Sequence, residues 1–291
     1  MATIETKAYA KINLALDVTG VRDDGYHEVR MVMQTLSLHD RIYIMETDND
    51  SITMTTNLPF LPADRSNLAY LAAQFFMEET GIKKGLHISL NKHIPVSAGL
   101  AGGSSDAAAV LRGLNVLFNA KVPNEKLMEI AARLGADVPY CLMGGTVLSE
   151  GIGEKLTSLF NAPYASCLLI KPSFSVSTKH IYEKLDLNTV KHHPDIDKMI
   201  AAITSGSHSA ICEASENILE PVTTAEYPEV AEIKKLLLEN GADCAVMSGS
   251  GPTVFGLYND KEKAKEAFIK FKAGKYAKYS FMTGYKYNIN T

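Results

Sequence analysis

The chain lacks the features that would assign it to several common classes of protein. No apolar run in its 291 residues approaches the roughly 18 that a membrane-spanning helix needs, and its first residues lack the apolar core of a signal peptide. It carries 29 Lys and Arg against 33 Asp and Glu, so the net charge is −4 and no basic excess is present to bind nucleic-acid phosphates. We therefore expect a cytoplasmic protein that binds neither membranes nor nucleic acids.

Cysteine is also scarce. The chain has four cysteines, none of them in a CxxC pair and all of them among apolar or small neighbours. This pattern predicts reduced and mostly buried thiols rather than a disulfide framework or a metal centre.

Several nucleotide-binding and catalytic motifs are missing as well. The chain has no Walker A loop, no GxGxxG fingerprint and no HRD or DFG of eukaryotic-type protein kinases. HExxH and GxSxG are absent too, which weakens the interpretation as a metalloprotease or an α/β-hydrolase.

Apolar residues make up 46% of the chain and charged residues 21%, which is typical of a globular protein, and the length fits about two domains. Residues 8–17 alternate between apolar and polar, which predicts a strand with one buried face. Helical and strand patterns then follow in mixed order, which favours an α+β fold over a doubly wound sheet. We expect strands at 38–45, 86–90, 167–170, 245–247, 253–258 and 278–283, and helices at 67–80, 106–119, 124–134, 179–185, 195–204, 229–240 and 261–272.

A glycine-rich segment at residues 95–105 is the strongest functional signal. It follows a predicted strand, precedes a predicted helix and holds three glycines and two serines. Glycines let the backbone approach an anion closely, and a helix start offers free N–H groups and the positive end of the dipole. The segment therefore predicts a phosphate-binding loop, although a tight turn with a Ser-Ser-Asp helix cap is the structural alternative. The residues concerned are Pro95, Val96, Ser97, Ala98, Gly99, Leu100, Ala101, Gly102, Gly103, Ser104 and Ser105.

Three further features are weaker when taken singly. Lys11 shares a predicted strand face with Asn13, where a solvated surface lysine would be ordinary. Asp137 lies just past a predicted helix, where it could simply fix a turn. Residues 248–253 (Ser-Gly-Ser-Gly-Pro-Thr) form a second glycine-rich turn, either structural or a second wall of an anion site.

Taken in order along the chain, these segments resemble the GHMP kinase family, whose members phosphorylate small alcohols with ATP. Any one segment is weak evidence for the family, but the whole set in this order is specific to it and spans most of the chain. The matching segments are residues 7–14, 23–28, 95–108, 134–139, 144–146, 151–154 and 249–253.

The resemblance implies a two-domain α+β fold, with a ribosomal protein S5 domain 2-like N-terminal domain at 1–155 and a ferredoxin-like C-terminal domain at 156–291. It implies ATP and Mg²⁺ as cofactors, with the phosphate loop at 95–105. Oligomeric state is left open between a monomer and a homodimer.

The resemblance also implies roles for single residues. Lys11 and Asp137 correspond to the catalytic pair, and Ser104 or Ser105 would supply a hydroxyl to Mg²⁺. The substrate would be a small alcohol carrying cytidine diphosphate, contacted by Asn13, Tyr26, His27 and Tyr182.

Two alternatives remain open at this point. One is a GHMP-type kinase for a mevalonate derivative, homoserine or a sugar, although those alcohols have no base for Tyr26, His27 and Tyr182 to bind. The other is a phosphate-loop binding protein without catalysis, although a pure binder needs no catalytic base such as Asp137.

Overall fold

The computed structural model describes residues 1–289 and divides the chain into two compact units. The first unit comprises residues 1–10, 38–96 and 101–143, and the second comprises 11–37, 97–100 and 144–291. Strands β1 (Thr3–Val21) and β2 (His27–Thr47) contribute residues to both units. The expected domain boundary between residues 155 and 156 stays a prediction.

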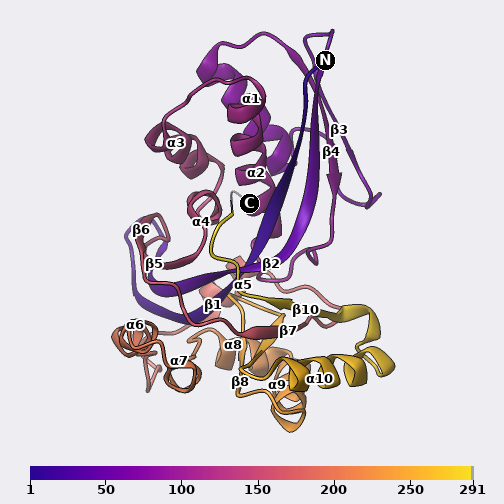
Figure 1. Cartoon of the computed structure of the whole chain (residues 1–291). Helices are drawn as coiled ribbons and strands as arrows, with labels where there is room; N and C mark the ends of the chain where they lie inside the picture. The colour runs from indigo at the N-terminus through magenta and orange to yellow at the C-terminus, as the bar shows by residue number, and fades with distance from the viewer. Residues whose placement is uncertain (290–291) are drawn as a thin grey trace. The chain divides into compact units, whose positions relative to one another are not determined.

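The first unit pairs a sheet with helices. In it, β2 is antiparallel to β4 with Arg41 opposite Asn91, and β3 is parallel to β4. Helices α1, α2 and α3 lie together on one side of these strands, as Figure 1 shows. Its remaining elements are β3 (Ile52–Thr56), α1 (Leu68–Thr80), β4 (Gly85–Asn91), α2 (Gly102–Leu117), α3 (Asn124–Leu134) and α4 (Asp137–Met143).

The second unit contains two groups of strands. The N-terminal half of β2 pairs with β5 and β5 pairs with β6, while a separate four-stranded antiparallel sheet has the order β10-β7-β9-β8. The strands are β5 (Thr146–Gly151), β6 (Lys155–Ser158), β7 (Ser166–Ile170), β8 (Cys244–Met247), β9 (Val254–Tyr258) and β10 (Ser280–Gly284). The helices are α5 (Thr178–Lys184), α6 (Ile196–Thr204), α7 (His208–Ala214), α8 (Glu220–Glu226), α9 (Glu229–Glu239) and α10 (Lys261–Ala273), with a 3₁₀ turn at Ala277–Tyr279.

The expected α+β class is confirmed, and most of the expected helices occur within a few residues of their predicted bounds. Helix α1 ends at Gly81, whose φ of +67° is the left-handed conformation that glycine adopts readily. Pro123 and Gly135 flank α3 as expected. Within residues 1–289, no helix is both long and apolar enough to cross a bilayer.

Two expectations about individual elements were wrong, and two expected strands occur with different bounds. Helix α2 begins at Gly102 rather than at residue 106, so both glycines and both serines belong to its first turn. Strand β1 is buried on both faces from residue 8 to 18, not on one. The strand expected at 38–45 is confirmed, as part of the longer β2 of 21 residues. The strand expected at 278–283 begins at Ser280, after the 3₁₀ turn.

Candidate active site

The predicted phosphate loop connects β4 to α2 and has an unusual backbone. Ser97, Gly99 and Ala101 have φ values of +52°, +72° and +54°, so alternate residues lie in the left-handed region. At Gly99 a Cβ atom would come within 2.2 Å of the Ser248 carbonyl oxygen, so that only glycine fits there. The loop therefore holds a defined and strained conformation, which is common at ligand-binding sites.

The first turn of α2 is open to an anion. Its N-cap residue, Ala101, has no side chain that can accept a hydrogen bond, and the turn contains no acidic residue. The first N–H groups of a helix have no partner within the helix, and they carry the positive end of its dipole. Gly103 is exposed. This turn thus provides N–H donors and positive potential, and its exposed glycine leaves the backbone accessible to a phosphate.

The two serines predicted to bind Mg²⁺ differ in environment. Ser105 is buried and its hydroxyl donates to the Gly102 carbonyl oxygen at 3.0 Å. Ser104 is partly exposed. No group of three or more His, Cys, Asp or Glu within residues 1–289 is arranged to hold a metal. Mg²⁺ usually keeps several waters and is bound through few protein groups plus phosphates. Of the two serines, Ser104 is the more exposed.

Lys11 and Asn13 form a buried pair on β1. They are 5% and 1% exposed, and the Lys11 ammonium donates to Asn13 Oδ1 at 2.8 Å. The Asn13 amide in turn contacts Met31 Sδ at 3.1 Å. The backbone N–H of Lys11 donates to the Leu100 carbonyl, which ties the strand to the phosphate loop. Lys11 is therefore not the solvated surface lysine of the alternative interpretation.

The second glycine-rich turn lies against the same residues. Ser248 Oγ donates to the Gly99 carbonyl at 2.9 Å. Gly249 has a φ of +58°, and a Cβ built on it would lie 3.5 Å from Asn13 Oδ1 and 3.7 Å from Lys11 Nζ. The turn, residues 97–100 and the Lys11 pair are thus brought together within the second unit, as a wall of an anion site would be.

A buried asparagine that sequence reasoning missed supports this turn. The Asn217 amide donates to the Met247 and Gly249 carbonyls, each at 2.8 Å. Asn217 lies in the stretch 184–225, where no motif was found. Nothing local marks it, because its partners are about 30 residues away in the sequence.

Asp137 is the first residue of α4. It follows Gly135 past the end of α3, as expected, but it opens a further helix that was not predicted. Arg112 of α2 donates to the Cys141 carbonyl of α4 at 2.8 Å and to the Lys7 carbonyl of β1 at 3.0 Å. Asp137 belongs to the first unit and Lys11 to the second, and their action as a pair remains a prediction.

Two of the predicted substrate-binding residues meet in the second unit. His27 opens β2 and Tyr182 lies on α5, and their ring centroids are 5.0 Å apart with planes tilted by 59°. Tyr26 lies in the turn between β1 and β2 and is 60% exposed. The fold therefore unites a histidine and a tyrosine that are far apart in the sequence, while the ring of Tyr26 faces solvent.

A buried ionic cluster was also not predicted. Lys92, just before the loop, donates to the carboxylates of Asp40 and Asp106. Burial opposes the charge on Lys92, but the carboxylates of Asp106 and Asp40 outweigh this and raise its pKa. Burial raises the pKa of Asp106. Asp106 is therefore a core residue and not part of the Ser-Ser-Asp helix cap of the structural alternative.

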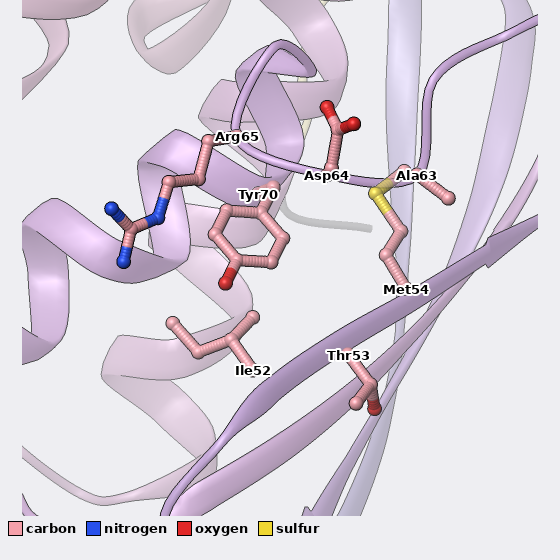
Figure 2. A pocket seen from close by; sticks show the side chains of 7 residues that line it. All are labelled: Ile52, Thr53, Met54, Ala63, Asp64, Arg65 and Tyr70. Carbon is pink, nitrogen blue, oxygen red and sulfur yellow. The ribbon is translucent and has the colours of Figure 1, made fainter.

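A cavity of about 680 Å³ opens in the first unit between β3, the start of α1 and the segment between them (Figure 2). In Figure 2 the side chains of Tyr70, Arg65 and Ile52 lie on one side of the cavity, and those of Met54 and Asp64 lie on the other. None of the residues predicted to act in catalysis or to bind ATP, substrate or Mg²⁺ lines this cavity. Its lining is Ile52, Thr53, Met54, Ala63, Asp64, Arg65 and Tyr70.

Comparison with known proteins gives consistent matches over nearly the whole chain. Residues 67–145 match the GHMP kinases N terminal domain, and residues 199–276 match the GHMP kinases C terminal domain. The chain is 52% identical to a 4-diphosphocytidyl-2-C-methyl-D-erythritol kinase of Lachnoclostridium phytofermentans, over 97% of both chains. It is 49% identical to the enzyme of the same name from Caldicellulosiruptor bescii, over 92% of this chain and 94% of that one.

Solved structures agree with these matches. A crystal structure of 4-(cytidine 5'-diphospho)-2C-methyl-D-erythritol kinase matches with a TM-score of 0.83 and 32% identity, over 98% of this chain and all of that one. A homoserine kinase from Cytophaga hutchinsonii has a TM-score of 0.77 at 22% identity, over 98% of this chain and 94% of that one, and shares the fold. The expected two-domain GHMP kinase fold is confirmed.

Proposed function

We propose that this chain, which belongs to the GHMP kinase family, phosphorylates 4-diphosphocytidyl-2-C-methyl-D-erythritol with ATP. The γ-phosphoryl group would pass to the 2-hydroxyl, giving ADP, the 2-phosphate and a proton. The reaction belongs to the non-mevalonate route to isoprenoid precursors. In the part of the chain that the structure describes, none of the four cysteines forms a disulfide, which is consistent with the cytoplasm as its location.

The phosphate loop is the observation that carries this proposal. Its left-handed residues lead into a helix whose first turn has no capping side chain and no acidic residue. Such a turn stabilises the charge of a bound triphosphate. We assign residues 95–105 to the phosphates of ATP.

Mg²⁺ bound with ATP would neutralise charge that builds up on the phosphates during transfer. We assign its protein ligand to the Ser104 hydroxyl rather than to Ser105, because Ser104 is partly exposed and Ser105 is buried. The chain's own contribution here is positional, because the serine is held at the start of α2.

Asp137 and Lys11 carry the proposed chemistry. Asp137 accepts the proton of the substrate hydroxyl as that oxygen attacks the γ-phosphorus, a role typically worth about 10²- to 10⁴-fold in rate. Asp137 is held at the first position of α4. The Lys11 ammonium, oriented by Asn13, supplies positive charge toward the transferred phosphoryl group.

The substrate's cytosine distinguishes this reaction from those of other family members. A base needs flat surfaces and hydrogen-bonding groups, and the neighbouring rings of His27 and Tyr182 offer both. Asn13 and Tyr26 complete the proposed substrate contacts. The pair of rings formed by His27 and Tyr182 favours the cytidine-bearing alcohol over mevalonate, homoserine or a sugar.

An acceptor panel tests the proposal. The purified protein is incubated with Mg-ATP and, separately, with the cytidine-bearing alcohol, mevalonate, homoserine and galactose, and ADP and phosphorylated product are measured by mass spectrometry. We expect transfer only to the first acceptor. Transfer to another acceptor would support the alternative kinase, and nucleotide binding without transfer to any acceptor would support a non-catalytic protein.

A further inference from the structure

Three charged side chains are buried together at the base of the phosphate loop. The side chains of Asp40, Lys92 and Asp106 are 0%, 4% and 3% exposed. The Lys92 ammonium donates to Asp40 Oδ2 and, at 2.6 Å, to Asp106 Oδ2. Burying charges is costly even when they are paired, so such a cluster is weak evidence for stability and calls for another role.

The cluster and a neighbouring asparagine hold the backbone where the loop begins. Asp40 accepts the N–H groups of His93 and Ile94 on its second carboxylate oxygen, the latter at 2.8 Å. Asn57 fixes the backbone of Lys92 on both sides, because its amide donates to the Lys92 carbonyl and accepts the Lys92 N–H. The first residues of the loop are therefore held by side chains, beyond the end of the β4 ladder.

The same cluster also contacts the helix that follows the loop. Asp106 is the fifth residue of α2, and a Cβ built on Gly102 would lie 3.2 Å from Lys92 Nζ. The ammonium thus lies against the first residue of the helix as well as against Asp106. One ion pair, between residues 14 apart, closes the whole segment 93–105.

We propose that Asp40, Lys92 and Asp106 form a clasp that holds the start of α2 in its phosphate-binding position, which makes Asp40 and Asp106 positioning residues for the nucleotide. The proposal rests on the function inferred above. Left-handed conformations at Ser97 and Ala101 are unfavourable for residues other than glycine and persist only where the surroundings impose them. Fixing both ends of the segment imposes that conformation, and it keeps the N–H groups aimed at the phosphates.

The test compares Asp106→Ala with Asp106→Asn, because asparagine keeps an oxygen for Lys92 to donate to and alanine does not. The dissociation constant for Mg-ADP is measured by titration calorimetry, alongside Tm and the KM values for ATP and for the alcohol. We expect Asp106→Ala to weaken Mg-ADP binding roughly 10- to 100-fold, the scale expected for misplaced binding groups, with little change in KM for the alcohol. Asp106→Asn should restore most of the binding.

Leu114→Ala is the matched control, since Leu114 is fully buried on the same helix, eight residues further along. It should lower Tm while leaving Mg-ADP binding at the wild-type level. If Asp106→Ala is not recovered folded, Asp106→Leu is measured in its place, because leucine fills the space of the carboxylate and leaves Lys92 paired with Asp40.

Wild-type binding of Mg-ADP by the alanine or leucine variant, in folded protein, would overturn the clasp. So would equal weakening of Mg-ADP binding by Leu114→Ala, because the effect would then follow stability alone. Failure of the wild-type protein to bind Mg-ADP would instead refute the proposed kinase function.

Discussion

Gly99 and Gly103 lie four residues apart in the phosphate loop, and the structure predicts opposite effects when each is replaced by alanine. Gly99 has a φ of +72°, which costs about 1–2 kcal/mol for an L-residue. The new Cβ would lie 2.2 Å from the Ser248 carbonyl oxygen and displace the turn whose hydroxyl donates to Gly99. Losing that hydrogen bond adds about 1 kcal/mol. We expect Gly99→Ala to lose about 2–3 kcal/mol of unfolding free energy.

Gly103→Ala should behave in the other direction. A Cβ built on Gly103 has Leu68 Cδ1 as its nearest neighbour, at an ordinary 3.7 Å, and the residue lies within α2. Alanine within a helix is favoured over glycine by roughly 0.5–1 kcal/mol, so stability should hold or rise. Binding of Mg-ADP should weaken nonetheless, and further with Gly103→Val, because the side chain occupies the space where a phosphate approaches the backbone.

Urea unfolding and calorimetric titration with Mg-ADP separate these two effects. Unfolding of Gly99→Ala at the wild-type midpoint would refute the steric argument at the Ser248 turn. Wild-type affinity for Mg-ADP in both Gly103 variants would refute the assignment of this turn of α2 to the phosphates. A loss of stability in Gly103→Ala would show that this glycine is required by the fold rather than by a ligand.

Three further predictions concern other parts of the site. Asp137→Asn should lower kcat by roughly two to four orders of magnitude with KM within several-fold in steady-state assays, and a near-normal kcat would limit Asp137 to a structural role at the start of α4. His27→Ala should lower kcat/KM for the cytidine-bearing alcohol and leave the Kd of Mg-ADP unchanged, whereas equal losses in both, or none, would exclude it as a reader of the base. Arg112→Met should lower unfolding free energy by about 2 kcal/mol or more, because the Cys141 and Lys7 carbonyls lose their donors. Arg112→Lys should recover part of the lost unfolding free energy in the same urea titration. If Arg112→Met unfolds at the same urea concentration as the wild type, the two hydrogen bonds of Arg112 contribute nothing to stability.

The sequence predicts elements well where one face of a helix is apolar and the ends carry clear signals. Helices α1, α3 and α10 were located in this way, with caps at Asn67, Pro123 and Asp260. The start of α2 was placed too late because glycine and serine are poor helix formers, and packing overrides that preference here. Strand β1 was assigned one buried face because alternation suggests it, but both faces are covered between residues 8 and 18.

The site was predictable as far as its residues lie in continuous runs. The phosphate loop, the turn at 248–253 and Lys11 each stand out locally, and the structure brings Lys11 to Asn13 and the turn to Gly99. Asn217 supports that turn from a distant part of the chain, so no local pattern identifies it.

The pairing of Asp40 with Lys92 depends on the register of β2 and β4, which the sequence alone does not reveal. Taken alone, an aspartate within a strand is expected to be exposed, since carboxylates are rarely buried without a partner. The antiparallel register of β2 and β4 sets Arg41 opposite Asn91, and extending it by one position past the end of β4 would set Asp40 opposite Lys92. A cross-strand pair of opposite charge at the end of a ladder is favourable, and here it lies where the loop begins. Once the register is known, Asp40 and Lys92 can be paired without side-chain coordinates, and only the arrival of Asp106 from α2 requires the tertiary fold.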